Sequence, residues 1–298
     1  MFRRALNHIG IFFLNMLSLL PMPILYGLAK AMYFLLYRVI GYRLSVVREN
    51  LQLALPERSP EERRLIEKKF YKYLATLVVE IVKMGSISKK ELEKRFRIKR
   101  SELMESYFAK GEGVLLCAAH YGNWEWGSVA IGLAASGQNY PIYKPLNNPV
   151  FDNWFQKARS RFGSKLISMR QTLRAIQASK GEASIFCFGS DQAPSRDESH
   201  YWTTLLHQES SIQLGIEKIA RKTNRPIFYF NVTAVQEGYY EAEFVPLCLN
   251  PQETAEFEIT EMHTRFLEKM IRKEPAYWLW SHRRWKHKRL ADDVSSNP

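Results

Sequence analysis

Val114-Leu115-Leu116-Cys117-Ala118-Ala119-His120-Tyr121-Gly122-Asn123-Trp124-Glu125-Trp126 is the stretch that decides the fold. Its apolar half follows Gly113, begins with a β-branched residue and has no helical period, so it predicts a buried strand of a parallel sheet. The strand ends at His120, the pair Gly122-Asn123 is typical of a turn, and a helix with Glu125 in its first turn follows. This order predicts an imidazole and a carboxylate folded toward each other at the carboxyl end of a strand, where open α/β sheets bind ligands.

In this arrangement His120 is a candidate general base and Glu125 its orienting acid. A neutral imidazole can take the proton of a hydroxyl that attacks a carbonyl, while a carboxylate on the other ring nitrogen fixes the tautomer. The alternative is a histidine that merely ends a strand and an acid that interacts with the helix dipole. The position at the end of a buried strand favours the catalytic interpretation.

The motif His-x4-Glu, from His120 to Glu125, resembles the His-x4-Asp/Glu signature of glycerolipid and lysophospholipid acyltransferases. Its form, His-x-Gly-Asn-Trp-Glu, resembles the branch that contains the late acyltransferases of lipid A biosynthesis. Further blocks in the same order extend the resemblance over nearly the whole chain: Tyr143-Lys144-Pro145-Leu146-Asn147-Asn148-Pro149, Gly189-Ser190-Asp191-Gln192-Ala193-Pro194, Glu217-Lys218-Ile219-Ala220 and Trp280-Ser281-His282-Arg283-Arg284-Trp285. The resemblance implies an O-acyltransferase that moves a fatty acyl chain from acyl carrier protein to a hydroxyl of a lipid A precursor, on the cytoplasmic side of a bacterial inner membrane.

The resemblance also implies substrate-binding residues outside the first motif. Lys144 follows a second expected strand, where its cation would hold a phosphate of either substrate. Asp191 follows a buried strand over 183–188 and would reach the same sheet edge as His120, although an acid in this place is equally typical of a turn. The residues that we assign to substrate binding are Asn123, Lys144, Asp191, Gln192 and Arg284.

Two parts of the chemistry stay open in the sequence. If Glu125 is not the partner of His120, Asp197 or Glu198 could take that role. Backbone amides at the Gly122-Asn123 corner, or a nearby cation, would stabilise the oxyanion of the tetrahedral intermediate.

Composition narrows the class of protein and its partners. The chain has 298 residues, of which 46% are hydrophobic, and a formal net charge of +13, so anionic partners are expected: lipid headgroups, phosphorylated substrates, an acidic carrier protein or nucleic acid. The three cysteines have no CxxC spacing and lie in apolar segments, which indicates reduced core residues in a cytosolic compartment. Nucleotide-binding, HExxH and GxSxG motifs are absent, and His200 and His207 lack metal-ligand companions, so we expect neither cofactor nor metal.

The N-terminal residues 1–42 are expected to anchor the protein in a membrane. Ile9 to Ala29 carry no formal charge, and this is about the length that a bilayer-spanning helix needs. The break at Pro21-Met22-Pro23 and a second apolar stretch from Ala31 to Tyr37 favour a helical hairpin or interfacial anchor equally well. A buried core helix is the alternative. Basic flanks and aromatic residues favour contact with anionic phospholipids.

The remaining pattern predicts one acyltransferase domain over 43–291 and a disordered tail over 292–298. Charged helices are expected over 43–100. The terminal segment from Trp278 to Arg289 mixes tryptophans with cations, a composition that suits a membrane interface or nucleic acid. Because an N-terminal anchor is expected, the membrane is the simpler partner of this segment. Strands alternate with helices, so the fold class is α/β with a mixed, mainly parallel central sheet flanked by helices, like the glycerolipid acyltransferases. The expected elements are strands at 114–119, 140–143, 165–168, 183–188, 226–233 and 240–245, helices at 124–135, 150–162, 171–179, 212–222 and 257–272, and a substrate-covering loop at 195–208.

Three other functions are compatible with the motifs. The same chemistry could act on another lipid, such as an aminolipid, a phosphatidylinositol mannoside or a lysophospholipid. A hydrolase would release free fatty acid without an acceptor. A basic membrane-binding or nucleic-acid-binding protein with a structural His120 would keep its activity when that residue is replaced by alanine.

Overall fold

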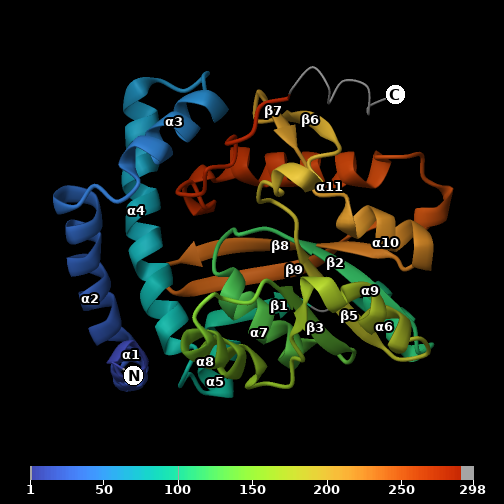
Figure 1. The fold of residues 1–298 in the computed structure, drawn as a ribbon, viewed down its shortest axis with the longest axis horizontal. Helices are drawn as coiled ribbons and strands as arrows, with labels where there is room; N and C mark the ends of the chain where they lie inside the picture. The colour runs from blue at the N-terminus through green and yellow to red at the C-terminus, as the bar shows by residue number, and fades with distance from the viewer. Residues whose placement is uncertain (1, 100, 290–298) are drawn as a thin grey trace.

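The computed structural model describes residues 2–99 and 101–289, and its centre is a seven-stranded sheet in the order β1-β9-β8-β2-β5-β3-β4 (Figure 1). Neighbouring strands from β8 to β4 are parallel, whereas β9 is antiparallel to β8 and β1 is parallel to β9. The bounds are β1 Phe96–Lys99, β2 Gly113–Ala118, β3 Gln138–Tyr143, β4 Ile167–Ser168, β5 Ser184–Gly189, β8 Ile227–Gln236 and β9 Tyr239–Cys248. The predicted α/β fold with a mainly parallel central sheet is therefore confirmed.

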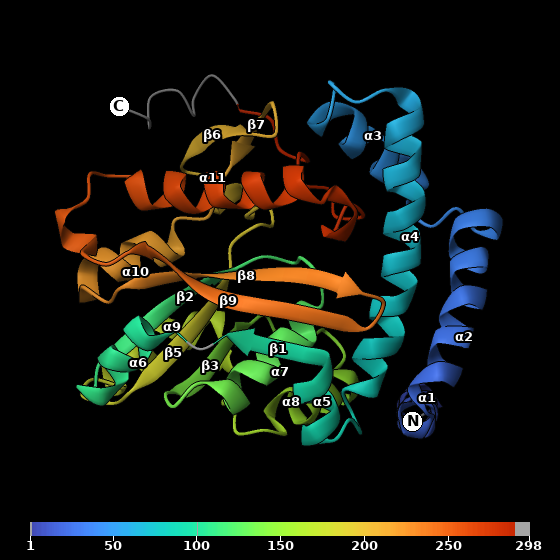
Figure 2. The ribbon, with the colours of Figure 1, turned by 180° about the vertical axis from the view of Figure 1, so that it is seen from behind.

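Helices cover the sheet on both sides. Figures 1 and 2 place α10 and α11 on one side of β8 and β9, and α7 and α8 on the other. Val114 to Cys117 in β2 are fully buried, which explains the unbroken apolar run. The helices are α3 Leu44–Ala54, α4 Pro60–Lys83, α5 Lys89–Arg95, α6 Glu102–Ala109, α7 Trp124–Ala134, α8 Pro149–Ser160, α9 Thr172–Ala178, α10 Gly215–Thr223 and α11 Glu258–Lys273. As predicted, Cys117, Cys187 and Cys248 are free and buried.

The N-terminal segment forms α1 (Phe2–Leu19), α2 (Met22–Tyr33) and a π-helical turn, η1 (Phe34–Val39), with a break at the predicted proline. α2 packs against α4 through Met22, Leu25 and Ala29. Many large apolar side chains of α1, α2 and η1 are exposed, namely Leu6, Ile9, Phe12, Phe13, Met16, Leu17, Leu19, Ile24, Leu28, Phe34, Leu35, Val39 and Ile40. No single described helix is long and apolar enough to cross a membrane; by length and composition, only the pair Met22–Val39 and Leu44–Ala54, bent by 84°, meets that requirement together.

Two segments differ from the sequence-based expectation. Residues 43–100 were expected to be helical throughout, but β1 forms the edge of the sheet there. The expected loop at 195–208 contains a 3-10 turn, η3 (Arg196–Glu198), and part of an antiparallel hairpin of β6 (Trp202–Leu205) and β7 (Gln208–Ser211). The tail at 292–298 lies outside the described residues.

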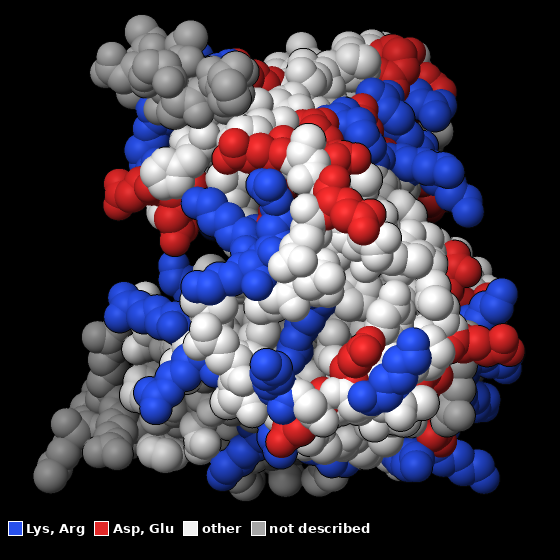
Figure 3. All heavy atoms as spheres, turned by 90° about the vertical axis from the view of Figure 1, so that its right-hand side faces the viewer, with Lys and Arg blue, Asp and Glu red and all other residues white. Residues whose placement is uncertain are grey.

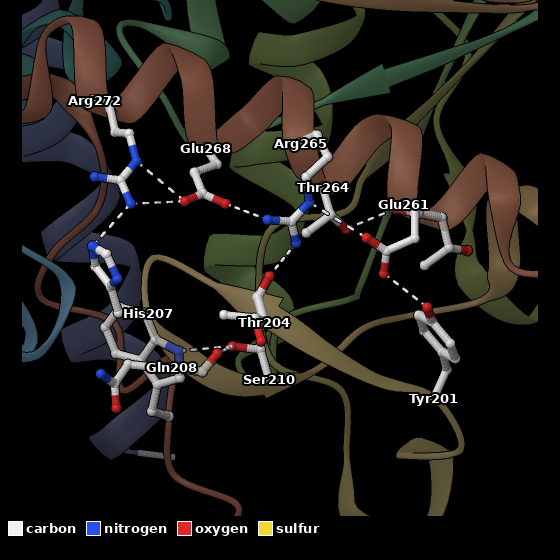
Figure 4. Close-up of polar contacts among 12 residues, drawn as sticks. Tyr201, Thr204, His207, Gln208, Ser210, Glu261, Thr264, Arg265, Glu268 and Arg272 are labelled. Carbon is white, nitrogen blue, oxygen red and sulfur yellow. Dashed lines mark hydrogen bonds and ion pairs between the residues drawn. The ribbon is translucent and has the colours of Figure 1, made fainter. Parts of the chain in front are cut away.

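The hairpin of β6 and β7 is attached to α11 by polar contacts (Figure 4). Tyr201 donates its hydroxyl to Glu261 Oε1 at 2.7 Å, Arg265 donates to the Thr204 carbonyl, and Arg272 Nη2 lies 3.1 Å from His207 Nε2. These contacts attach the segment to α11, so it is not the free substrate-covering loop that was expected.

Candidate functional site

Two neighbouring parallel strands end side by side and deliver the central residues of the site. In the register of β2 and β5, Ala118 pairs with Gly189, and the Ser190 amide donates to the Ala118 carbonyl at 3.0 Å. His120 and Asp191 each follow the last residue of their strand by two positions. The sequence-based expectation that both reach one sheet edge agrees with this register.

Asp191 holds His120 at two points. Its Oδ1 lies 2.7 Å from His120 Nδ1, and its Oδ2 accepts the His120 backbone N–H at 3.0 Å. Oδ2 also accepts a hydrogen bond from Trp278 Nε1 at 3.0 Å. Asp191 is buried, whereas 27% of the His120 side chain remains exposed, with the Trp124 ring in edge contact. A hydrogen bond from Nδ1–H to the carboxylate leaves Nε2 as the acceptor nitrogen.

The charges of the pair stabilise each other. Burial lowers the pKa of His120, but the carboxylate of Asp191 outweighs it and raises the pKa above the ordinary value of 6.5. For Asp191, burial raises the pKa of the carboxyl, and the contacts with His120 and Trp278 bring it below its ordinary value. Asp191 is therefore ionised at neutral pH and favours an imidazolium that forms beside it.

The hydrogen bonds of the Glu125 carboxylate go to Arg159 and not to the imidazole, although its charge also raises the pKa of His120. Its carboxylate makes a bidentate ion pair with Arg159 on α8, with Nε to Oε2 at 2.7 Å and Nη2 to Oε1 at 2.6 Å. The first turn of α7 points this side chain toward α8, so the orienting contact predicted for Glu125 is made by Asp191 instead. Asp197 and Glu198 lie exposed in η3, and neither is hydrogen-bonded to His120.

Besides Asp191, two further residues assigned to substrate binding are enclosed by protein. Asn123 is fully buried; its Nδ2 donates to Glu80 Oε2 at 2.7 Å, and its Oδ1 caps α7 by accepting the Trp126 N–H at 2.9 Å. Arg284 is only 2% exposed and donates Nη2 to the Ser211 carbonyl at 2.9 Å, while its Nε has no partner. Their contacts in the structure are with protein, because neither side chain reaches the surface.

The other two assigned residues are accessible. Lys144 is exposed directly after β3, on the same sheet edge as His120. Gln192 is partly buried and follows Asp191. Arg159 was not anticipated, because nothing in the sequence around α8 marks it and its partner lies 34 positions earlier. In the described ranges 2–99 and 101–289, no group of three or more His, Cys, Asp or Glu side chains is arranged to hold a metal ion.

A sequence model of the family described as bacterial lipid A biosynthesis acyltransferase matches residues 1–287. The chain belongs to this family. It is 25% identical over 288 residues to the lipid A biosynthesis lauroyltransferase of Escherichia coli (strain K12), covering 95% of this chain and 92% of the relative. It is 23% identical over 269 residues to the lipid A biosynthesis palmitoleoyltransferase of the same organism, covering 90% and 86%. A lipid A biosynthesis acyltransferase of Haemophilus influenzae is 23% identical over 282 residues, covering 91% and 85%.

The predicted family and enzyme class are thus confirmed: the protein is an acyltransferase of lipid A biosynthesis.

In this lipid A acyltransferase a buried carboxylate on α4 supports the turn after His120. Glu80 accepts hydrogen bonds from Asn123 Nδ2, from the Tyr240 hydroxyl at 2.8 Å and from the Tyr26 hydroxyl at 3.2 Å. Burial raises the pKa of Glu80 to about 7, although all three donors oppose the shift. The single side chain of Glu80 therefore connects α2 and α4 to the turn after His120.

The C-terminal block of the acyltransferase packs directly behind the pair. Residues Tyr121 and Trp278 form an isolated antiparallel bridge, and the Gly122 N–H donates to the Tyr277 carbonyl at 3.0 Å. His282 Nε2 accepts the Ala193 N–H at 3.3 Å, and burial lowers the pKa of His282 to about 4. A neutral His282 thus holds the loop that carries Asp191.

Proposed function

We propose that the protein is a membrane-associated O-acyltransferase that moves a fatty acyl chain from acyl carrier protein to a hydroxyl of a lipid A precursor. The observation that carries the proposal is the His120–Asp191 pair at the carboxyl edge of the sheet, in a chain that belongs to a family of acyltransferases. The similarity to a lauroyltransferase and a palmitoleoyltransferase of lipid A biosynthesis supports the acyl group and the acceptor.

In the proposed mechanism His120 Nε2 takes the proton of the acceptor hydroxyl while the oxygen attacks the thioester carbonyl. Asp191 stabilises the imidazolium that results. The tetrahedral intermediate collapses, the carbon–sulfur bond breaks, and the imidazolium returns the proton to the leaving sulfur. The products are an ester and a free thiol, and no acyl-enzyme forms.

We assign Arg159 as the donor to the oxyanion. It lies close enough to His120 to oppose the rise of its pKa, and Glu125 fixes the guanidinium by two hydrogen bonds. The amide of Gly122, one of the donors suggested by the sequence, is already bonded to the Tyr277 carbonyl. A fixed cation that faces a developing negative charge lowers the barrier because it needs no reorganisation. Glu125 would then act as a positioning residue for Arg159.

The N-terminal helices supply the membrane contact in this proposal. The exposed apolar side chains of α1, α2 and η1 form a surface that a soluble monomer rarely carries. An amphipathic hairpin in the interface, with basic residues meeting anionic phospholipids, accounts for this surface without a full span. We place the catalytic domain on the cytoplasmic side of the bacterial inner membrane.

The test is mass spectrometry of lipid A from a deletion strain, complemented with wild type, His120→Ala or Asp197→Asn. The proposal expects one fatty acyl group to be lost and restored by wild type and Asp197→Asn but not by His120→Ala. If a different lipid loses its acyl chain, the chemistry stands and the acceptor is wrong. Full complementation by His120→Ala contradicts the catalytic proposal, and fatty acid release without acceptor indicates a hydrolase.

A further inference from the structure

An exposed surface at the exits of β3 and β4 lies on the same sheet edge as the His120–Asp191 pair. Tyr143 at the end of β3 pairs with Ser168 at the end of β4, so Lys144 and Met169 leave the sheet side by side. In the strand order, β4 is three strands from β2, which corresponds to about 14 Å at the usual strand spacing. This surface is therefore next to the pair but does not cover it.

This surface contains two pairs of neighbouring residues, and each pair consists of an apolar residue followed by an arginine. Met169, in the 3-10 turn after β4, is 47% exposed, and Leu173, in the first turn of α9, is 36% exposed. Arg170 and Arg174 are exposed one position after each of them. We name this set, with Lys144, the β4 exit surface. In the part of the chain that the structure describes, none of its three cations forms an ion pair with an acid.

We propose that the β4 exit surface docks the small acidic carrier protein that presents the acyl thioester, an inference that rests on the donor named in the proposed function. Unpaired cations around a small apolar centre match the anatomy of a transient interface with an acidic protein, where charge steers association. From a position about three strands away, a thioester on a flexible arm can reach His120 Nε2 along the strand ends.

A protein fits this surface better than a bilayer does. The large exposed apolar surface belongs to α1, α2 and η1, and Figures 1 and 2 show α1 and α2 at one end of the molecule and α9 toward the other. Two side chains are too few to insert into a membrane, since an interfacial anchor needs an extended apolar face. Figure 3 views the right-hand side of Figure 1, where Lys and Arg side chains cross the middle of the surface and acidic side chains lie above and below them.

The test compares charge-reversed variants in steady-state transfer from acyl carrier protein. Arg170→Glu with Arg174→Glu should raise KM for the acyl carrier protein about tenfold, with kcat within about twofold of wild type. Arg170→Gln with Arg174→Gln should give an intermediate KM. The matched control is Lys90→Glu with Lys94→Glu on α5, which makes the same charge change at exposed positions of another surface and should leave KM unchanged. Binding to vesicles of phosphatidylethanolamine and phosphatidylglycerol should be equal for all variants.

The outcomes separate this inference from the proposed function. Equal KM values for the Arg170/Arg174 variant and the control would overturn docking at this surface while leaving the donor intact. A loss of vesicle binding confined to the Arg170/Arg174 variant would reassign the surface to the membrane and overturn protein docking. If wild type transfers from acyl coenzyme A but not from acyl carrier protein, the proposed donor fails, and docking fails with it.

Discussion

Replacing Asp191 with asparagine tests the pairing that the structure assigns to His120. The wild-type carboxylate accepts three hydrogen bonds: one at Oδ1 from the imidazole and two at Oδ2, from the His120 N–H and from Trp278. An asparagine can satisfy the two N–H donors only by turning its oxygen toward them, which places its NH2 group against Nδ1. The imidazole must then carry its proton on Nε2, and it can no longer act as a base.

The size of the effect follows from the alternative orientation. Keeping the active tautomer would leave two buried N–H donors facing an NH2 group, at a cost of about 1–3 kcal/mol each. The active form would therefore lie about 2–6 kcal/mol above the inactive one, and since about 1.4 kcal/mol is a factor of ten, kcat should fall roughly 30- to 20,000-fold. That range includes the usual contribution of a general base, about 100- to 10,000-fold.

The assay is transfer of a labelled acyl chain to the lipid acceptor at saturating donor, with product measured by mass spectrometry. Asp197→Asn makes the same chemical change at an exposed acid in η3 and should retain full activity. Glu125→Gln should lower the rate through Arg159 but keep the titration of His120 in the pH profile. A kcat of the Asp191→Asn enzyme within threefold of the wild-type value would refute the pairing of Asp191 with His120.

The pKa of His120 is raised above 6.5, so kcat/KM should increase with pH through a midpoint above 6.5; a midpoint below that value in a profile from pH 5 to 9 would contradict the role of Asp191. Trp278→Phe removes the N–H donated to Asp191 and should lower kcat about 5- to 30-fold in the same assay, whereas unchanged kcat would show that the contact is dispensable. Glu80 has a pKa of about 7 in the fold against 4.5 for an unperturbed carboxyl, so the folded state binds the extra proton and stability falls as pH rises from 4.5 through 7. Glu80→Gln should flatten that decline, as measured by urea unfolding at pH 5 and 8; an unchanged slope would exclude Glu80 as its source. Phe12 and Phe13 are 58% and 59% exposed, so changing both to serine should weaken vesicle binding at least about tenfold in co-sedimentation; unaffected binding would remove α1 from the membrane contact.

The sequence predicts the sheet and the convergence at its edge because both depend on local signals. The buried run before His120 and the one before Asp191 are unbroken and apolar, and parallel strands bring their carboxyl ends together. The partner of Glu125 is not local: Arg159 is on another helix, and only the packing of α7 against α8 brings the two together.

The segments predicted wrongly lack the expected signals. β1 is a short edge strand, and its charged residues Arg97 and Lys99 resemble the solvent-exposed face of a helix. The hairpin of β6 and β7 turns at Leu206 and His207, both with positive φ, whereas such turns are usually marked by Asn-Gly or Asp-Gly. Asn123 is a polar residue three positions after His120, which suggested a contact with substrate, but its side chain caps a helix inside the protein.

The two-point hold of Asp191 on His120 fixes the orientation of the imidazole. One carboxylate binds both the backbone N–H and the ring, so rotation about the Cα–Cβ bond would break the 2.7 Å contact while the backbone stayed fixed. In the proposed mechanism a hydroxyl is deprotonated only where it approaches Nε2 along one direction. Choice among the hydroxyls of a polyhydroxylated lipid therefore belongs to the surfaces that hold the lipid, and altering those surfaces should redirect acylation without touching the base.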